Sequence, residues 1–371
     1  MTSFCSDFTI VFKALSKTSF KLMPSIKLKE LAGLLGLSQT TVSRALNGYP
    51  EVREETRQRV LRVATKHNYQ PNTRATGLAT GRAKAIGHVI SIDSKNELVN
   101  PVFGEFIAGA SQIYSANGYE LLLTIENSQN EEETYRNIAA KGAVDGLIVH
   151  SPKRDDSRVA LLRDIGLPFV IHGRVSECDL DYSWVDFNNR RAFQQATKLL
   201  LDLGHRRLAL INGIETLNFA WLRRQGYLSA LSNAGIEADD ALMSSHEMTE
   251  GNGYYTASAM LAKKNRPTAF LVSSYMLALG VRRAIAHAGL QMGEDISVII
   301  HDDEFSFFQN NDPVPQFTAT RSSVREAGVR AADMLLKIID DPSLAPMSEL
   351  LEAHLTIGSS TGAFKRVTIS D

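Results

Sequence analysis

The chain has 371 residues, of which 44% are hydrophobic and 22% are charged. At roughly 100–200 residues per domain, this length predicts two or three globular domains and excludes a disulfide-stapled miniprotein or a disordered chain. The two cysteines, Cys5 and Cys178, supply neither a disulfide framework nor the paired spacing of a structural zinc site, so we expect a reduced protein of the cytoplasm. No segment reaches the roughly 18 apolar residues of a membrane span, so we expect no membrane partner.

Positive charge is concentrated near the amino end. Residues 24–82 carry ten Lys and Arg against four Asp and Glu, a net charge of +6, whereas residues 83–371 carry 27 against 36, a net charge of −9. This asymmetry indicates a small module that meets a polyanion, joined to a larger one that does not. A chance cluster on a solvated surface explains the charge alone equally well.

Residues 1–22 do not have the pattern of a secretory signal. Their short apolar run is interrupted by Lys13 and preceded by Asp7, and no small-residue cleavage pattern follows it. Met23 stands just before the first strongly patterned segment. We therefore interpret residues 1–22 as a start-site artefact that precedes the natural first residue.

Two short helices are predicted after Met23. Apolar residues recur at three- and four-residue spacing from Leu28 to Leu35, which is typical of one helix face, and Gly36 ends that helix. Ser38 is a suitable N-cap for a second short helix. The residues of that helix that face outward are Gln39, Thr40, Ser43 and Arg44.

A third helix is predicted over 54–67, so that residues 23–70 form one small all-α domain. Two helices joined by a short glycine-containing turn form a helix-turn-helix, which places its second helix in a DNA major groove. The outward set suits that role, because glutamine can pair with adenine, arginine with guanine, and threonine or serine with bases or phosphate. An ordinary αα-hairpin with a polar outer face is the alternative, and the positive charge favours DNA binding.

The pattern changes beyond residue 81 to short apolar runs that alternate with amphipathic segments. Strands separated by helices predict parallel βαβ units. About 280 residues are too many for one such sheet of ordinary size, so we expect two doubly wound lobes with a cleft between them. The predicted strands are 86–92, 120–125, 147–150, 169–172, 208–211, 269–272 and 298–300.

Ligands of parallel sheets bind beyond the carboxyl ends of the strands, so polar residues that follow these runs are candidate contacts. They include no nucleophile–base pair. Carboxylates and a guanidinium can bind vicinal hydroxyl groups, and an aromatic or methionine side chain can cover the apolar face of a sugar ring. For each single residue, polar anchoring at a strand end is the alternative. The candidates are His150, Ser151, His172, Gly173, Arg174, Asp186, Asn212, Gly213, Ser273, Ser274, His301, Asp302 and Asp303.

The segments TVSRALNG (41–48) and YQPNTRATGLATGR (69–82) resemble the LacI family of transcriptional regulators, and the resemblance extends over more than 300 residues. It implies that Gln39, Thr40 and Arg44 read bases, and that residues 71–83 form a hinge that orders on operator DNA. Leu78 matches the residue that the family wedges into the minor groove, where an apolar wedge kinks DNA. The residues implied to contact DNA are Ser38, Gln39, Thr40, Ser43, Arg44, Asn47, Asn72, Ala75 and Leu78.

Two positions of this region depart from the family pattern. Gly77 lowers helix propensity in the hinge by about 1 kcal/mol relative to alanine, so we expect the hinge to be disordered without DNA. Arg53 stands where the family commonly has a capping serine, which predicts a weaker start of the third helix.

Six further segments fall in the order expected of LacI-type effector domains: NPVFGEFIAGA (100–110), VDGLIVHSP (144–152), SWVDFNN (183–189), LGHRRLALING (203–213), RRQGYLSAL (223–231) and IIHDDEF (299–305). The resemblance implies that Asp186, Arg223 and Asp302 make polar ligand contacts. Tyr275 and Ile300 depart from the family near this pocket, which predicts an altered or smaller ligand. The other residues implied around the ligand are Phe103, His150, Ser151, Arg174, Met248 and Ser274.

Within the family, the likeness is to repressors for α-glucosides and raffinose-type α-galactosides, through HSPKRDD (150–156) and GHRRLALING (204–213). We therefore expect a homodimeric repressor, with an effector domain over 84–371, that a sugar releases from a palindromic operator. We expect no cofactor. Whether the ligand releases or tightens DNA binding stays open, because purine-responsive relatives bind DNA more tightly when their ligand is bound. The choice between a dimer and a tetramer also stays open.

Two other classes of protein are weighed against this one. An enzyme could use His301, Asp302 and Asp303 as a metal or general-base cluster, but adjacent side chains of a strand point to opposite faces, and no GxSxG, HExxH or P-loop motif occurs. A sugar-binding protein of periplasmic type would need export and has no use for basic helices. We therefore expect neither a metal site nor a catalytic residue.

Overall fold

The computed structural model describes residues 26–69, 81–91, 100–126, 130–308, 310 and 313–365. The predicted extension 1–22 and the hinge positions Asn72, Ala75, Gly77 and Leu78 lie outside these residues. The chain divides into two compact units, Met1–Gly81 and Arg82–Asp371, so the boundary falls within the segment predicted as a hinge.

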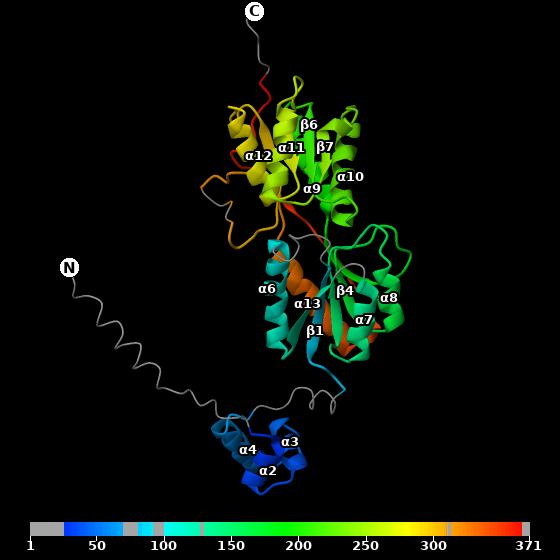
Figure 1. Ribbon diagram of the computed structural model, residues 1–371, viewed down its shortest axis with the longest axis vertical. Coiled ribbons are helices and arrows are strands. Elements are labelled where there is room, and N and C mark those ends of the chain that lie inside the picture. Colours follow the sequence, from blue (N-terminus) through cyan, green and yellow to red (C-terminus); the bar gives the residue numbers. More distant parts are fainter. Residues whose placement is uncertain are drawn as a thin grey trace, which may run out of the picture. The chain divides into compact units, whose positions relative to one another are not determined.

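The described part of the first unit, residues 26–69 and Gly81, contains three helices, as the sequence predicts: α2 (Leu28–Leu35), α3 (Gln39–Leu46) and α4 (Glu54–Lys66) (Figure 1). Each helix contributes apolar side chains to one core, because their apolar residues recur at helical spacing. The core consists of Leu31, Ala32, Leu35, Val42, Ala45, Val52, Val60 and Ala64.

The turn between α2 and α3 depends on two residues. Gly36 has a φ of 64°, in the left-handed region that favours glycine, and its N–H donates to the carbonyl of Ala32. Ser38 Oγ then accepts a hydrogen bond from the N–H of Thr41 at 3.0 Å, which caps α3. Arg53, before α4, makes no such side-chain cap.

Over its described residues, the second unit has two lobes, each built on a six-stranded sheet. All neighbouring strands are parallel except β12, which runs antiparallel to β10. The first lobe has the strand order β11-β5-β4-β3-β1-β2, with β1 (Ala85–Ser91), β2 (Glu120–Glu126), β3 (Gly146–Val149), β4 (Phe169–His172), β5 (Ser183–Phe187) and β11 (Ser348–Leu351). The second has the order β12-β10-β9-β8-β6-β7, with β6 (Leu208–Asn212), β7 (Met243–Ser245), β8 (Ala269–Val272), β9 (Ser297–Asp302), β10 (Thr318–Arg321) and β12 (His354–Thr356).

Helices cover both faces of each sheet (Figure 1). In the first lobe, α6 (Pro101–Ala116) and α13 (Val324–Asp340) pack on one face, and α7 (Glu131–Ala140) and α8 (Arg158–Ile165) pack on the other. In the second lobe, the corresponding pairs are α11 (Glu250–Leu261) with α12 (Tyr275–His287), and α9 (Asn189–Asp202) with α10 (Asn218–Asn233). This covering explains why the central strands are apolar runs without alternation.

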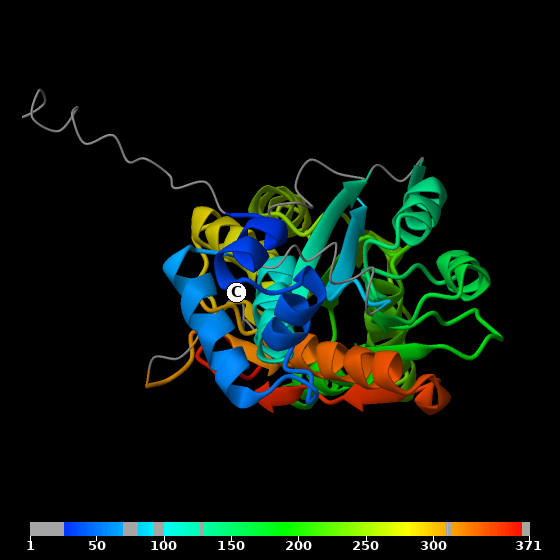
Figure 2. The same ribbon diagram turned by 90° about the horizontal axis from the view of Figure 1, so that it is seen from below.

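Helices α6 and α13 lie side by side although more than 200 residues separate them in the sequence (Figures 1 and 2). Glycines allow this approach. A Cβ atom on Gly328 would lie 2.1 Å from the carbonyl oxygen of Phe106, and one on Gly109 would lie 2.0 Å from that of Arg325. Any side chain at Gly328 or Gly109 would therefore force the two helices apart.

The chain passes between the lobes three times. It leaves the first lobe after β5, returns between β10 and α13, and crosses again between β11 and β12. Each lobe is thus assembled from separated stretches of sequence, and the crossing segments flank the space between the lobes.

The predicted fold class, a small helix-turn-helix domain plus two doubly wound parallel lobes, is confirmed. The seven predicted strands are present within a few residues, but β5, β7, β10, β11 and β12 were not predicted. Four of these carry polar residues at most positions or lie at a sheet edge, so they show no continuous apolar run. Within the described residues, no helix has the length and apolar character needed to cross a membrane.

Candidate functional site

Helix α3 presents a polar face. Gln39, Thr40 and Arg44 are exposed, and no residue of the described part of this unit hydrogen-bonds to their side chains. Thr40 and Arg44 are four residues apart and so lie one above the other on the helix. These side chains are available to donate to or accept from base edges.

Ser38, Ser43 and Asn47, which were also predicted to contact DNA, take part in hydrogen bonds within α3. Ser38 caps the helix through Thr41, and Asn47 Nδ2 donates to the carbonyl of Ser43 at 2.9 Å. These bonds order the ends of the helix and thereby fix the direction of its polar face.

The first unit carries further basic residues, and two of them have a structural role. Arg59 donates to the carbonyl of Leu35 at 2.9 Å, and Arg57 donates to that of Tyr49 at 2.9 Å, so both tie the third helix to the rest of the unit. The other basic side chains that are exposed are Lys27, Lys29, Arg44, Arg53, Arg62 and Lys66. They give the unit the positive surface that attracts a polyanion.

A cleft of about 140 Å³ lies between the two lobes of the second unit. It collects polar residues from the carboxyl ends of the strands and apolar residues from the helices and loops beside them, as ligand sites of parallel sheets do. Its lining consists of Asn100, Val102, Phe103, Ser151, Pro152, His172, Gly173, Arg174, Asp186, Phe187, Asn189, Leu217, Phe219, Arg223, Met248, Asp303 and Val324.

Asp186 and Arg174 form an ion pair in the wall of the first lobe. Arg174 Nε donates to Asp186 Oδ2 at 2.9 Å, and the N–H of Phe187 donates to Oδ1 at 2.8 Å. Burial nevertheless raises the pKa of Asp186 to about 6, because the loss of water outweighs Arg174 and the backbone hydrogen bond. A ligand would thus meet a carboxylate that is ionised at neutral pH and has few water molecules around it.

Arg223 crosses from α10 into the cleft wall of the second lobe. Its Nε donates to Asn189 Oδ1 and its Nη1 to the carbonyl of Ser273, each at 2.7 Å. The guanidinium carbon also lies over the ring of Phe193, 5.2 Å from its centroid, and over that of Phe219, 4.9 Å from its centroid. Burial lowers the pKa of Arg223 to about 10, so the group stays charged at neutral pH.

The two lobes touch on both sides of the cleft. On one side Asn218 donates its N–H to the carbonyl of Pro152 at 2.9 Å and its Nδ2 to that of Arg174 at 2.7 Å. On the other side the N–H of Ser306 donates to Glu105 Oε1 at 2.7 Å. These bonds join residues of different lobes, so the structure is that of a closed cleft.

Six of the nine residues predicted to contact an effector line the cleft, namely Phe103, Ser151, Arg174, Asp186, Arg223 and Met248. The other three do not. Ser274 caps α12 by accepting from the N–H of Leu277, His150 lies behind His172, and Asp302 accepts from the N–H of Glu304.

Asp303, and not Asp302, is the second carboxylate of the cleft wall. Successive side chains of an extended segment point in opposite directions, so only one of the pair can face the cleft. Burial alone would raise the pKa of Asp303, but the hydrogen bond to His301 and the nearby Arg223 lower it overall. Asn189 and Phe219 also line the cleft but are not among the predicted residues. Asn189 follows the end of β5, and Phe219 lies near Arg223 on α10, so both positions could have been recognised from the sequence.

Tyr275 and Ile300, the two departures from the family pattern, do not line the cleft. Tyr275 packs against Phe317 in the core of the second lobe, with ring centroids 5.7 Å apart, and Ile300 is buried in the same core. Neither side chain therefore contacts the cleft, and the altered or smaller ligand stays a prediction.

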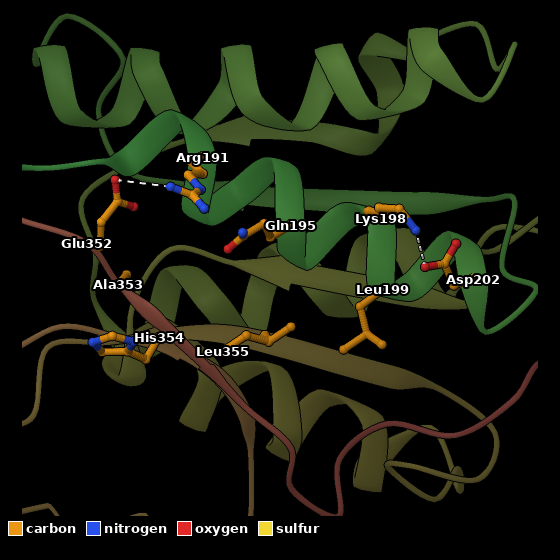
Figure 3. Close-up of a pocket in the computed structure, with 9 residues that line it drawn as sticks. All are labelled: Arg191, Gln195, Lys198, Leu199, Asp202, Glu352, Ala353, His354 and Leu355. Carbon is orange, nitrogen blue, oxygen red and sulfur yellow. Dashed lines mark hydrogen bonds and ion pairs between the residues drawn. The ribbon is translucent and has the colours of Figure 1, made fainter.

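A second hollow, of about 560 Å³, lies outside the cleft (Figure 3). It is formed by one side of α9 and by residues 352–355, which make the crossing from β11 and the start of β12. Its charged side chains already pair with one another, Arg191 with Glu352 and Lys198 with Asp202. Because these side chains are largely exposed, water competes for every polar contact there, and we assign the ligand site to the cleft.

The two units together define a transcriptional regulator that binds DNA through a helix-turn-helix and carries a ligand-binding unit. Residues 27–72 match the model of bacterial regulatory proteins of the lacI family, and residues 197–361 match the periplasmic binding protein-like domain. The chain is 44% identical over 337 residues to the HTH-type transcriptional regulator AglR of Rhizobium meliloti (strain 1021), covering 91% of this chain and 94% of that protein. The chain therefore belongs to the LacI family. This confirms the prediction of a transcriptional regulator and not of an enzyme.

Solved structures agree with this assignment. The lac repressor dimer bound to operator and the anti-inducer ONPF superposes with a TM-score of 0.80 and 25% identity, covering 91% of this chain and all of that chain. The complex of the transcriptional regulator CelR with cellobiose has a TM-score of 0.67 and 28% identity, covering 90% of this chain and 99% of that one.

Proposed function

We propose that the protein is a homodimeric repressor of the cytoplasm, released from a palindromic operator by a sugar of the α-glucoside or α-galactoside type bound between its lobes. In this proposal residues 23–70 read DNA, residues 71–83 form the hinge, and residues 84–371 bind the sugar and the second subunit. The observation that carries the proposal is the closed cleft with two carboxylates and two guanidinium groups.

The cleft has the chemistry that a sugar requires. Asp186 and Asp303 can accept hydrogen bonds from hydroxyl groups, and Arg174 and Arg223 can donate to them. Phe103, Phe219 and Met248 are apolar side chains in the same lining that can cover a sugar ring. The CelR complex supports this class of ligand, because that relative holds the disaccharide cellobiose. Ser151 completes the lining, and His150 lies within hydrogen-bond distance of the lining residue His172.

The exposed face of α3 supports the DNA part of the proposal. Gln39, Thr40 and Arg44 would read base edges, while Ser38, Ser43 and Asn47 hold the helix and contact the backbone. Asn72, Ala75 and Leu78 would enter the minor groove. A dimer follows from operator symmetry, and the lac repressor structure is a dimer on its operator.

Ligand binding would act by changing the stability of the closed cleft relative to an open one. An opening of the cleft would break contacts across the lobes such as that of Asn218 with Arg174. A ligand that binds the closed form more tightly shifts the equilibrium, and such coupling typically amounts to about 1–3 kcal/mol.

The test is an operator-binding assay with maltose, cellobiose and raffinose, using duplexes from upstream of sugar-uptake genes. Replacing Arg223 by alanine should abolish release by the active sugar and leave operator affinity unchanged. Arg224→Ala is the matched control, since Arg224 is the next residue of α10 and lies outside the cleft lining. Normal release of Arg223→Ala, or turnover of one of these sugars, would overturn the proposal.

A further inference from the structure

Four buried side chains form a hydrogen-bonded series that ends at the cleft. Tyr114 Oη lies 2.9 Å from His88 Nε2, His88 Nδ1 lies 3.1 Å from His150 Nε2, and His150 Nδ1 lies 3.4 Å from His172 Nδ1. Tyr114 is 1% exposed, His88 0% and His150 3%, whereas His172 lines the cleft. The residues come from α6, β1, the end of β3 and the end of β4.

The rings are held in place by neighbouring aromatic side chains. Phe106 stacks on His172 with centroids 4.3 Å apart and meets His150 edge-on at 4.9 Å. The ring orientations, and therefore the pairs of nitrogen atoms that face each other, are fixed by packing.

All three histidines are neutral at physiological pH. Burial lowers the pKa of His88 to about 3 and that of His150 as well. It lowers the pKa of His172 to about 4, although the nearby carboxylate of Asp303 acts in the opposite direction. A neutral imidazole has one N–H donor and one acceptor nitrogen, so each ring of the series must choose between two tautomers.

Tyr114 decides which atom of each pair in the series is the donor and which is the acceptor. Burial raises the pKa of Tyr114, so the phenol keeps its proton, and His88 Nε2 is the only acceptor that the described residues provide for it. His88 then carries its proton on Nδ1 and donates to His150 Nε2. His150 in turn carries its proton on Nδ1 and donates to His172 Nδ1. The remaining proton of His172 is on Nε2.

We propose that Tyr114, His88 and His150 are positioning residues that fix His172 as a hydrogen-bond donor toward the ligand in the cleft. The donor would recognise a lone pair of a hydroxyl or ring oxygen and would reject an ammonium group, which has none. This inference rests on the proposed function only in its statement about the ligand, because the tautomer of His172 belongs to the ligand-free protein.

The test is a long-range proton–nitrogen correlation spectrum of the full-length protein with ¹⁵N-labelled histidine, recorded without sugar at pH 7.5. His172 is assigned by comparison with His172→Gln. The expected result is a single Nε2–H tautomer for His172 and Nδ1–H tautomers for His88 and His150. A proton on Nδ1 of His172 would overturn the proposal.

Tyr114→Phe removes the hydroxyl that sets the direction without touching the cleft lining. We expect it to give mixed tautomers of His172 and to weaken binding of the sugar that releases operator by about two- to tenfold, the value of one neutral hydrogen bond. Tyr227→Phe is the matched control, because its buried hydroxyl donates to the carbonyl of Leu208 in the other lobe. Equal spectra and equal affinities for the two variants would also overturn the proposal.

The two proposals fail in different ways. If none of the three sugars binds, the proposed function fails. The tautomers measured in the ligand-free protein still show whether the hydrogen bonds run from Tyr114 to His172. If a sugar binds and the series has the opposite direction, only the positioning role is lost.

Discussion

Replacing Asp186 by asparagine is expected to stabilise the protein at neutral pH. Burial raises the pKa of Asp186 from 3.8 to about 6 in the folded protein, in spite of Arg174. Between these two pH values the folded protein binds more protons than the unfolded chain, so the free energy of unfolding falls as the pH rises through them. The difference corresponds to about 3 kcal/mol above pH 7, because one pKa unit is worth about 1.4 kcal/mol.

Asparagine avoids this cost because it carries no charge, but it also weakens the contact with Arg174. The attraction of the ion pair is already contained in the pKa of about 6, so the further loss is the hydrogen bond from Arg174 Nε, which an amide replaces poorly and which is worth about 1 kcal/mol. The carbonyl oxygen of asparagine can still accept from the N–H of Phe187. The expected net gain is therefore about 2 kcal/mol at pH 8 and about 0.5 kcal/mol at pH 5, where the penalty of ionisation is already about half developed.

The measurement is urea unfolding of Asp186→Asn and the unmodified protein at pH 5, 6, 7 and 8. The difference in free energy of unfolding should grow with pH, most steeply between pH 5 and 6 and very little above pH 7. Asp181→Asn is the control, since Asp181 is exposed and its substitution should give a small difference with no such rise. A difference that does not change with pH, or a loss of stability at pH 8, would refute the reasoning. The same variant should no longer respond to sugar.

Three further predictions concern DNA reading, helix packing and the amino end. Arg44→Ala should lower specific operator affinity by about 1–3 kcal/mol and relax base preference in a competition assay, whereas Arg62→Ala should weaken binding to all duplexes alike; unchanged preference would remove Arg44 from the readout. Gly328→Ala should destabilise the second unit by about 1–3 kcal/mol in urea unfolding, whereas Gly104→Ala, whose Cβ meets nothing within 4 Å, should be neutral or stabilising. Deletion of residues 1–22 should leave operator affinity unchanged in the same binding assay, and a collapse of affinity would show that the segment has a function.

The fold follows largely from local patterns in the sequence. Apolar spacing located α2, α3 and α4, and apolar runs located the central strands of both sheets, because buried parallel strands must be apolar on both faces. The strands that were missed lack that signal. β11 and β12, for example, are edge strands of four and three residues whose side chains are mostly exposed or half-buried.

The cleft was harder to predict because it depends on the direction of each side chain. The sequence placed Asp302 and Asp303 next to the cleft, but only the register of β9 decides which of them faces it. The series from Tyr114 to His172 was not predicted at all. Its members lie on four elements, and only the order of the strands in the sheet brings them together.

The interleaved course of the chain also constrains how the protein is made. Helices α2, α3 and α4 use contacts within about 40 residues, so that unit can fold soon after it leaves the ribosome. The sheet that begins with β1 cannot be completed until β11 has been synthesised, and Ala331 and Leu335 of α13 fill its core. A premature stop near residue 320 would therefore damage the lobe that was started first, and the nascent chain would expose the apolar face of α6 for most of its translation.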